Sequence, residues 1–277
     1  MKKLLVIAGS GVYPELLVTN AKKAGVAKVD VLAVKGSTSR RVRSLADAVI
    51  EFGLGEIATA VSWASKAGYE GAILAGQISP LSLFRTRFDK ETIKWLSELN
   101  AKNAHSLFGK LVEKFEEAGL KILPASLYMQ DSLPGEGCIA KRDFSEQELK
   151  DVIHASKVVE DMGRHDVGQT VVVKDGMVLA VEAFEGTNAA IKRAGKLDGR
   201  GGVVFKAARV GHDMRFDIPV VGLKTLKVMK RAGITALAFH ANRLVMLDKE
   251  KVMDFANRHS IAIVGIKTDL PAAPTEP

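Results

Sequence analysis

The stretch KLLVIAGSGVYPE (residues 3–15) joins an apolar run, two glycines and a proline in the order that decides the fold of the first half of the chain. The apolar run is typical of a strand buried on both faces, and Pro14 suits the first turn of a helix. Two lysines precede the run, as in a signal peptide, but it is only about six residues long and no small-residue cleavage site follows. We therefore expect a first strand, a glycine turn and a helix.

The same alternation continues through the first half. Short apolar runs bounded by Gly or Pro predict parallel strands at residues 3–9, 29–36, 71–76 and 120–125. Helical spacing between them predicts helices at residues 13–24, 55–67 and 89–118, the last one broken near 100–103. Strands that alternate with helices of this length indicate βαβ units, and hence an α/β, Rossmann-like N-terminal domain with a parallel sheet.

The second half has a different pattern. A segment rich in Gly and Pro at residues 132–144 predicts a linker between domains at 1–131 and 145–268, with a flexible tail at 269–277. Two β-branched runs flank Lys174-Asp175-Gly176 and predict a hairpin. We expect a distinct α+β C-terminal domain, with helices at 145–162, 187–195 and from 223, and strands at 201–207, 235–239, 243–247 and 261–266.

Composition narrows the classes of function. The chain has 277 residues, 47% hydrophobic and 26% charged, which is typical of a globular protein, and no segment approaches the roughly 20 apolar residues that span a bilayer. A net charge of +8 suits an anionic partner such as a phosphorylated substrate or an anionic membrane surface. Scattered Lys and Arg, with one dense cluster at residues 40–43, and only 6% aromatic residues argue against nucleic acid. The single cysteine, Cys138, excludes an internal disulfide and a cysteine-based zinc site, and fits a cytoplasmic protein.

Two loops of the first domain are candidate binding sites. GSGVYPE (9–15) and GQISPLS (76–82) each follow a predicted parallel strand, and ligands of such sheets bind beyond the carboxyl ends of the strands. Gly9 and Gly11 would bring bare amides and a helix N-terminus to an anion. A dinucleotide fold matches poorly, because Pro14 stands where its third glycine would be and no acid ends the second strand. An NAD-linked oxidoreductase therefore remains only an alternative.

Polar residues of the second half cluster at strand ends and turns. The clusters are GRHDVGQ (163–169), VEAFEGTN (181–188), Lys206 and HDMRFDIP (212–219). Taken singly they predict ordinary structure: Thr187 or Asn188 as a helix cap, and Arg215 paired with Asp213 or Asp217. Taken together, acids, amides and a lysine favour a site that handles phosphate with a divalent metal. The histidines lack H-E-x-x-H spacing, and neither a G-x-S-x-G turn nor a P-loop occurs.

Residues 161–195 and 206–233, with VEAFEGT (181–187) and DMRFDIP (213–219), resemble the UDP-2,3-diacylglucosamine pyrophosphatases of lipid A synthesis, of the type unrelated to metallophosphoesterases. IAGSGVYPE (7–15) and AGQIS (75–79) extend the resemblance over nearly the whole chain, and Asn188 departs from it where an acid is expected. The resemblance implies hydrolysis of UDP-2,3-diacylglucosamine to UMP and the diacylated sugar 1-phosphate, lipid X, with Mg²⁺. It further implies substrate held between two domains, a homodimer, and a cytoplasmic enzyme in peripheral contact with the anionic inner-membrane surface.

Carried over by position, the essential aspartate of the family falls on Asp217, which we expect to be a metal ligand or to orient water, with Asp213 and Glu185 in catalytic support. The predicted substrate-binding residues are Gly11, Val12, Gly76, Gln77, Ile78, Gln169, Thr187 and Lys206. Acyl chains need an apolar chamber, and helical spacing leaves open whether the second-domain helices line it or pack a core. A non-catalytic protein that binds a sugar nucleotide or lipid is the main alternative.

Overall fold

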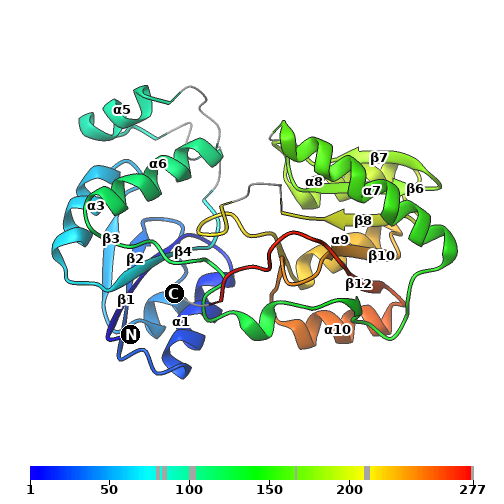
Figure 1. The fold of residues 1–277 in the computed structure, drawn as a ribbon, viewed down its shortest axis with the longest axis horizontal. Coiled ribbons are helices and arrows are strands. Elements are labelled where there is room, and N and C mark those ends of the chain that lie inside the picture. Colours follow the sequence, from blue (N-terminus) through cyan, green and yellow to red (C-terminus); the bar gives the residue numbers. More distant parts are fainter. Residues whose placement is uncertain (79–81, 83–85, 100–103, 166, 209–212, 276–277) are drawn as a thin grey trace. The chain divides into compact units, whose positions relative to one another are not determined.

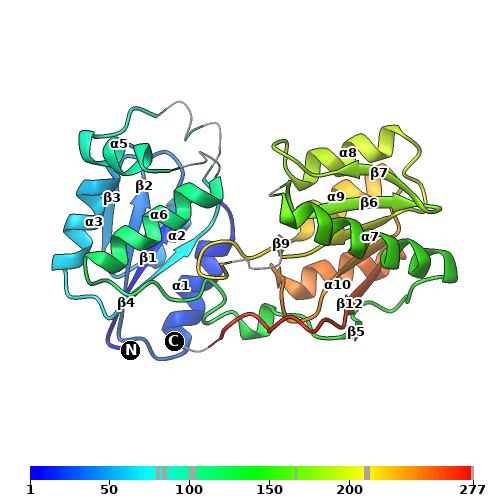
Figure 2. The same ribbon diagram turned by 45° about the horizontal axis from the view of Figure 1, so that its top comes forward.

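The computed structural model describes residues 1–277 except 79–81, 83–85, 100–103, 166, 209–212 and 276–277. The chain forms two units (Figures 1 and 2). Unit 1 contains Met1–Met129, Asp213–Asp217 and Pro274–Pro277, and unit 2 contains Gln130–His212 and Ile218–Ala273. The division lies close to the predicted boundary at residue 131, but a short piece of the expected second domain, Asp213–Asp217, belongs to unit 1.

Unit 1 is built on a parallel sheet with strand order β3-β2-β1-β4. Its strands are β1 (Lys3–Ala8), β2 (Lys28–Val34), β3 (Val49–Phe52) and β4 (Gly71–Ala75). Its helices are α1 (Tyr13–Lys23), α2 (Arg40–Leu45), α3 (Ile57–Lys66), α5 (Lys90–Ser97) and α6 (Ala104–Glu117). The strand order reverses between β1 and β4, which is where parallel α/β sheets place their ligands.

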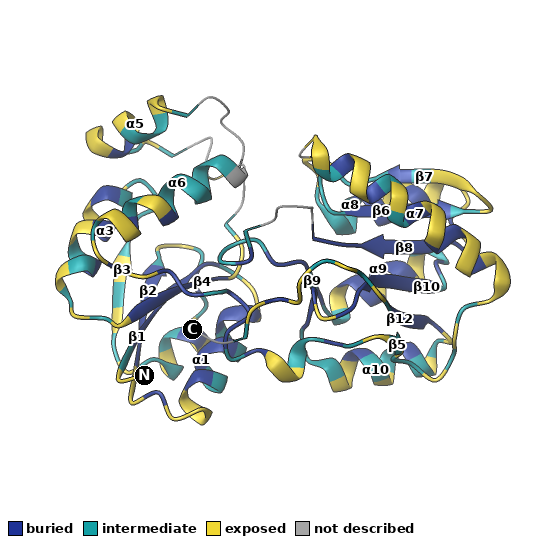
Figure 3. Ribbon diagram, in the orientation of Figure 1, coloured by how far each residue is buried: buried dark blue, intermediate teal, exposed yellow. Residues whose placement is uncertain are grey.

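Both faces of the unit 1 sheet are covered, as the continuous apolar runs predict. Leu5 and Ile7 of β1 pack with Leu32 and Leu74 in a core that also contains Phe115 of α6. The intervening side chains of β1 are also buried, and α1 contacts the same strand. Figure 3 shows β1, β2 and β4 buried along most of their length, while β3 is half-buried or exposed and the helices expose one side.

Two predictions for unit 1 are wrong. The expected strand at residues 120–125 reduces to an isolated bridge between Ile122 and Ala72, although Leu120, Ile122 and Leu123 are buried. In addition, α2 and β3 were not predicted. The strand β3 is an edge strand whose burial only alternates between exposed and half-buried, and α2 buries Val42 alone, so neither has a strong apolar pattern.

Unit 2 is built on a mixed sheet with strand order β5-β12-β10-β8-β6-β7. Its strands are β5 (Gly137–Cys138), β6 (Thr170–Lys174), β7 (Met177–Val181), β8 (Val203–Lys206), β10 (Ala236–His240) and β12 (Ala262–Ile266), beside a separate pair of β9 (Val220–Val221) and β11 (Val245–Met246). Its α-helices are α7 (Glu146–Arg164), α8 (Thr187–Lys196), α9 (Leu223–Ala232) and α10 (Lys249–Arg258), and a 3₁₀ turn covers Gln130–Ser132.

The expected α+β domain has a mixed sheet: the pairs β6–β7, β6–β8 and β5–β12 are antiparallel, whereas β8, β10 and β12 are parallel and are joined through α9 and α10. The hairpin turn lies where it was predicted: Asp175 and Gly176 have φ values of 50° and 77°, and Lys174 pairs with Met177. Part of the predicted linker forms β5, which pairs with β12. The predicted flexible tail includes Ala273, which is buried and donates its N–H to the Asn242 carbonyl.

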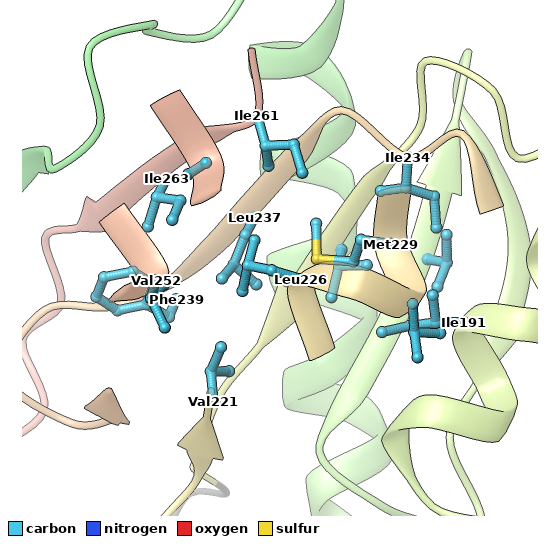
Figure 4. Packing of buried hydrophobic residues seen from close by; sticks show 14 of the residues in the cluster. Ile191, Val221, Leu226, Met229, Ile234, Leu237, Phe239, Val252, Ile261 and Ile263 are labelled. Atoms are coloured by element: carbon cyan, nitrogen blue, oxygen red, sulfur yellow. The ribbon is translucent and has the colours of Figure 1, made fainter. Parts of the chain in front are cut away.

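The core of unit 2 lies on both faces of its sheet. On one face, α8, α9 and α10 bury a cluster that includes Ile191, Leu226, Met229, Leu237 and Phe239 (Figure 4). On the other face, α7 packs Val152, Ala155 and Val159 against the strands. The helix α7 begins with a complete capping box between Ser145 and Glu148. These contacts hold the ends of β6, β7 and β8 in place, where the polar residues of this unit gather.

Candidate functional site

The glycine loops after β1 and β4 meet at the point where the strand order reverses. Ser10 and Gln77 exchange backbone N–H···O bonds of 2.8 and 2.9 Å, and the Ser10 hydroxyl donates to the Gln77 carbonyl. A Cβ at Gly9 would lie 2.6 Å from the Gln77 carbonyl oxygen, and one at Gly76, where φ is +90°, would lie 2.6 Å from that of Ser10. Only glycine allows this approach without a shift of the backbone.

The predicted binding residues of the first domain therefore lie together. Gly11 is exposed with φ at 100°, and Val12 occupies the N-cap position of α1 without any side-chain cap. The N-terminus of an uncapped helix, with backbone amides directed outward, can accept an anion. Gly76, Gln77 and Ile78 stand beside this turn through the Ser10–Gln77 bridge.

The turn at Asp213–Asp217 is held in unit 1 by contacts with Ala125 and Glu116. Ala125 accepts a hydrogen bond from the Tyr13 hydroxyl and donates its own N–H to the Met214 carbonyl at 3.0 Å, which joins this turn to the start of α1. The Arg215 guanidinium binds Asp213 at 2.7 to 3.1 Å and Glu116 of α6 at 2.8 and 2.9 Å. These two carboxylates, Asp213 first, raise the pKa of Arg215 above its ordinary value.

The predicted pairing of Arg215 with Asp213 is confirmed, and Glu116 is a partner that sequence reasoning missed. Asp213 is thereby held as part of the turn, while its backbone carbonyl accepts the N–H groups of Phe216 and Asp217. Asp217 itself is half-buried at the end of the turn. Asp217 is therefore not among the fully buried residues of unit 1.

A second polar group lies in unit 2 around the buried side chain of Lys206, which is 6% exposed. Its Nζ donates to Thr187 Oγ1 at 2.6 Å and approaches Thr170 Oγ1 at 3.4 Å. The Thr187 hydroxyl in turn donates to the Glu182 carboxylate at 3.0 Å, and Nζ lies 3.8 Å from Glu182 Oε2. A buried cation is thus linked to one carboxylate through a hydroxyl group.

Backbone geometry brings the members of this group together. Thr170 pairs with Lys206 across β6 and β8, and Gln169 accepts the N–H of Ala207 through its backbone carbonyl. Glu182 directly follows β7, and its N–H donates to the Thr170 carbonyl. Gly168 is required beside it, because a Cβ there would lie 2.3 Å from the Glu182 carbonyl oxygen. Gln169, Thr187 and Lys206 were all predicted to bind substrate, and they therefore lie near one another where β6 begins and β8 ends.

The start of α8 differs from the prediction. Gly186, with φ at 81°, is the N-cap, so neither Thr187 nor Asn188 caps the helix. The Thr187 side chain is committed to Lys206 and Glu182 instead. Glu182 lies in the polar cluster predicted at 181–188 but was not among the predicted site residues, and Thr170 lies just outside the predicted clusters. The strand ends before Glu182, which turns its side chain inward to 13% exposure instead of leaving it on a solvent-facing strand.

Glu185 faces a different partner. Its carboxylate binds Arg193 at 2.6 Å and accepts the Ala183 N–H at 3.2 Å. The hydrogen bond from Arg193 is the main reason that the pKa of Glu185 is lowered. Glu185 thus belongs to unit 2 and Asp213 and Asp217 to unit 1, so the three predicted catalytic acids do not form one local cluster within either unit.

The described residues contain neither a cluster of metal ligands nor a membrane-spanning helix. No group of three or more His, Cys, Asp or Glu side chains there is arranged to hold a metal ion by itself. Within the same residues, no helix has the length and apolar character needed to cross a membrane.

Comparison with known proteins gives matches over both halves. Residues 3–132 match the family model of the LpxI N-terminal domain, and residues 135–264 match that of the LpxI C-terminal domain. The UDP-2,3-diacylglucosamine pyrophosphatase LpxI of Caulobacter vibrioides is 30% identical over 283 residues, which covers 96% of this chain and 98% of that protein.

Solved structures give much weaker matches. A biotin carboxylase domain of a thermophilic 2-oxoglutarate carboxylase with bound ADP is 17% identical with a TM-score of 0.29, over 62% of this chain and 34% of that one. The corresponding Hydrogenobacter thermophilus domain is 14% identical with a TM-score of 0.29, over 70% and 40%. These values carry no structural argument. The two domain matches and the full-length relative do, and they show that the chain belongs to the LpxI family.

Proposed function

We propose that the protein hydrolyses the pyrophosphate bond of UDP-2,3-diacylglucosamine to give UMP and 2,3-diacylglucosamine 1-phosphate, lipid X, in lipid A biosynthesis. The observation that carries this proposal is the match to a pyrophosphatase of that specificity over 96% of the chain. The position of Asp217 supports it, because Arg215 and Ala125 hold the turn that contains this residue, and the residue is only half-buried.

The chemistry explains why one positioned carboxylate matters. A pyrophosphate diester carries a negative charge on each phosphate, and both charges repel an incoming water. Catalysis therefore consists mainly of positioning and of neutralising charge. We assign Asp217 to the reacting centre, as a metal ligand or as the group that orients water. Asp213 and Glu185 are held by Arg215 and Arg193, so we assign both to support as positioning residues.

The substrate phosphates need cationic and amide partners. We assign Lys206 and Thr187 in unit 2 to phosphate, because the Lys206 ammonium is a buried point charge that donates to the hydroxyl groups of Thr187, at the start of α8, and Thr170, at the start of β6. Gln169 lies near both and is assigned to the substrate with them. In unit 1, the exposed amides at Gly11 and Val12 and the adjoining Gly76–Ile78 loop are assigned to the substrate.

Mg²⁺ is the proposed cofactor. The residues fit it in a limited way: Mg²⁺ is commonly held by one or two carboxylates together with substrate phosphates, and Asp217 can supply one carboxylate. The described residues offer no cluster of three ligands, so we expect weak Mg²⁺ binding without substrate. When bound, the ion would neutralise phosphate charge and acidify a coordinated water.

The decisive experiment is the Asp217→Asn variant. Incubated with UDP-2,3-diacylglucosamine and Mg²⁺, it should release UMP at least about a thousandfold more slowly than the wild type. Calorimetry should still detect substrate binding, because the substitution removes a charge and little volume. The exposed Asp161→Asn substitution, which breaks a surface pair with Arg164, is the control and should keep full activity.

Three outcomes would revise the proposal. Normal turnover by Asp217→Asn would remove that residue from the reacting centre. UMP release that persists in EDTA would remove Mg²⁺ from the proposal. Tight substrate binding by the wild type without any UMP release would instead indicate a non-catalytic sugar-nucleotide-binding protein.

Two further proposals concern assembly. We propose a homodimer, for which sedimentation equilibrium should give twice the 29.8 kDa chain mass. We also propose peripheral contact with anionic membrane, in keeping with the net charge of +8. Salt-sensitive co-sedimentation with phosphatidylglycerol vesicles, but not with phosphatidylcholine vesicles, tests this contact.

A further inference from the structure

Unit 1 contains an apolar pocket at the carboxyl ends of β1, β2 and β3. Its walls come from strand ends such as Ile7 and Phe52, from Ala60 of α3, from Leu96 of α5 and from the face of α6 that carries Phe108. The space that atoms leave free there is about 700 Å³, counting the part open to solvent.

Among the residues that the structure describes, the lining is chemically uniform: every lining side chain is apolar, and one lining residue is a glycine. A uracil base, a sugar or a phosphate placed there would lose its hydrogen bonds to water and gain none from side chains, which is unfavourable. Phe52, Leu54 and Phe108 remain only half-buried, so apolar surface is left for a ligand to cover. The pocket therefore suits a hydrocarbon and disfavours the polar part of a nucleotide sugar.

The pocket is connected to the proposed reacting centre within the same unit. Ile78 of the second glycine loop forms part of its wall. Phe108, also in the wall, stacks on Phe216 with ring centroids 6.2 Å apart and planes inclined by 27°. Phe216 directly precedes Asp217 in the turn held by Arg215. One wall of the pocket is thus in contact with the residue next to the essential carboxylate.

We propose that this pocket binds one acyl chain of the substrate and sets the chain length that the enzyme prefers. The inference rests on the proposed function, because the two acyl chains are the hydrocarbon part of UDP-2,3-diacylglucosamine. It places an acyl-chain site on the helices α3, α5 and α6 of the first unit. The second-domain helices, which were considered for this role from sequence, pack against the hydrophobic cores of unit 2.

The helix α5 offers a matched pair of variants. Leu96 lines the pocket, whereas Ile93 on the same helix is 54% exposed and does not. Leu96→Trp should fill part of the pocket, and Ile93→Trp adds the same side chain to the surface. Ala60→Leu fills the pocket from α3 and provides a second test should Leu96→Trp fail to fold.

The measurement is kcat/KM for UMP release from diacetyl, dibutyryl, dihexanoyl and dioctanoyl homologues of the substrate. For the wild type, each methylene that enters the pocket should raise kcat/KM by about fourfold. For Leu96→Trp and Ala60→Leu, the ratio of dioctanoyl to diacetyl kcat/KM should fall at least tenfold. Ile93→Trp should keep the wild-type ratio. An unchanged ratio in both folded pocket variants would overturn the proposal.

A binding experiment separates this inference from the proposed activity. Calorimetric titration of the 1-phosphates of dioctanoyl- and diacetylglucosamine into the wild type and Leu96→Trp requires no turnover. Preference for the longer chain that Leu96→Trp abolishes would support the pocket even if the protein released no UMP. Hydrolysis with no dependence on chain length, in turnover and in binding, would refute the pocket and leave the hydrolase intact.

Discussion

The ion pair between Arg142 and Glu148 allows a quantitative prediction about unit 2. The Glu148 side chain is 7% exposed, and Arg142 binds both of its oxygens at 2.8 Å. The Ser145 N–H and the Thr235 hydroxyl donate to the same carboxylate at 2.8 and 2.7 Å. Burial alone would raise the pKa of Glu148, but the hydrogen bonds from Arg142, Ser145 and Thr235 outweigh burial and lower it to about 2.

The free energy follows from this pKa. The unfolded chain would have a Glu148 pKa of 4.5, so the shift to about 2 corresponds to roughly 3 kcal/mol at neutral pH. Because the folded-state pKa is the lower one, the stabilisation is complete above about pH 5 and is lost as the pH falls towards 2. We expect Glu148→Gln to lose about 3 kcal/mol at pH 7 and roughly half as much at pH 3. Glutamine still suits the capping box, so the loss reports the charge.

Two optical probes can assign this loss to unit 2. Both tryptophans, Trp63 and Trp95, lie in unit 1, so their fluorescence reports that unit during urea unfolding while circular dichroism reports both units. Glu148→Gln should shift the dichroism transition and leave the fluorescence transition in place. The exposed Glu146→Gln, in the same helical turn, is the control and should change stability by less than about 0.5 kcal/mol. A loss for Glu148→Gln that is equal at pH 7 and pH 3 would refute the reasoning.

Three further predictions concern Lys206, Arg215 and His240. Lys206→Met should lower kcat/KM for UMP release by about a hundredfold if its ammonium neutralises phosphate, whereas a cation that is only structural would change unfolding and leave kcat/KM in place. Arg215→Met should reduce kcat by about tenfold to a hundredfold with little change in KM, because it frees the turn beside Asp217. The control is Arg164→Met, which breaks the surface pair with Asp161 and should have no effect on kcat. Burial, and then the charge of Arg243, lower the pKa of His240 to about 4. As the pH falls, the unfolded chain therefore takes up a proton before the folded one does, and the free energy of unfolding decreases between about pH 6.5 and 4. His240→Gln should remove roughly 2 kcal/mol of the decrease in this free energy between pH 7 and pH 5, and an equal decrease in both proteins would contradict the prediction.

Features that depend on local sequence could be predicted. β1, its glycine turn and α1 follow from an apolar run, two glycines and Pro14, all within a few residues. The hairpin at Asp175-Gly176 follows from residues that tolerate positive φ. The meeting of the two glycine loops could also be inferred, because strands flanking a reversal of order end side by side.

Features that depend on tertiary contacts could not be predicted from the sequence. The run at 120–125 has the apolar pattern of a strand, but its side chains enter the core of unit 1 without a strand partner beyond one bridge. Glu182 has the pattern of a solvent-facing strand residue, and only the end of β7 one residue earlier turns it towards Thr187. Nothing in the order of residues indicates that Arg215 reaches Glu116 of α6.

The DMRFDIP segment (213–219) is divided between the two units, with Asp213–Asp217 in unit 1. In sequence it follows Lys206 closely and precedes β9, so it was expected to belong to the second domain, yet Asp213–Asp217 belongs to unit 1 through Ala125, Glu116 and Phe108. Lys206 remains in unit 2 at the end of β8. The proposed essential carboxylate thus shares a unit with the glycine loops and the apolar pocket, while the proposed phosphate-binding lysine belongs to the other unit. Substitutions around Phe108 should therefore change both the chain-length preference and kcat. Substitutions around Lys206 should change only the interaction with the substrate phosphates.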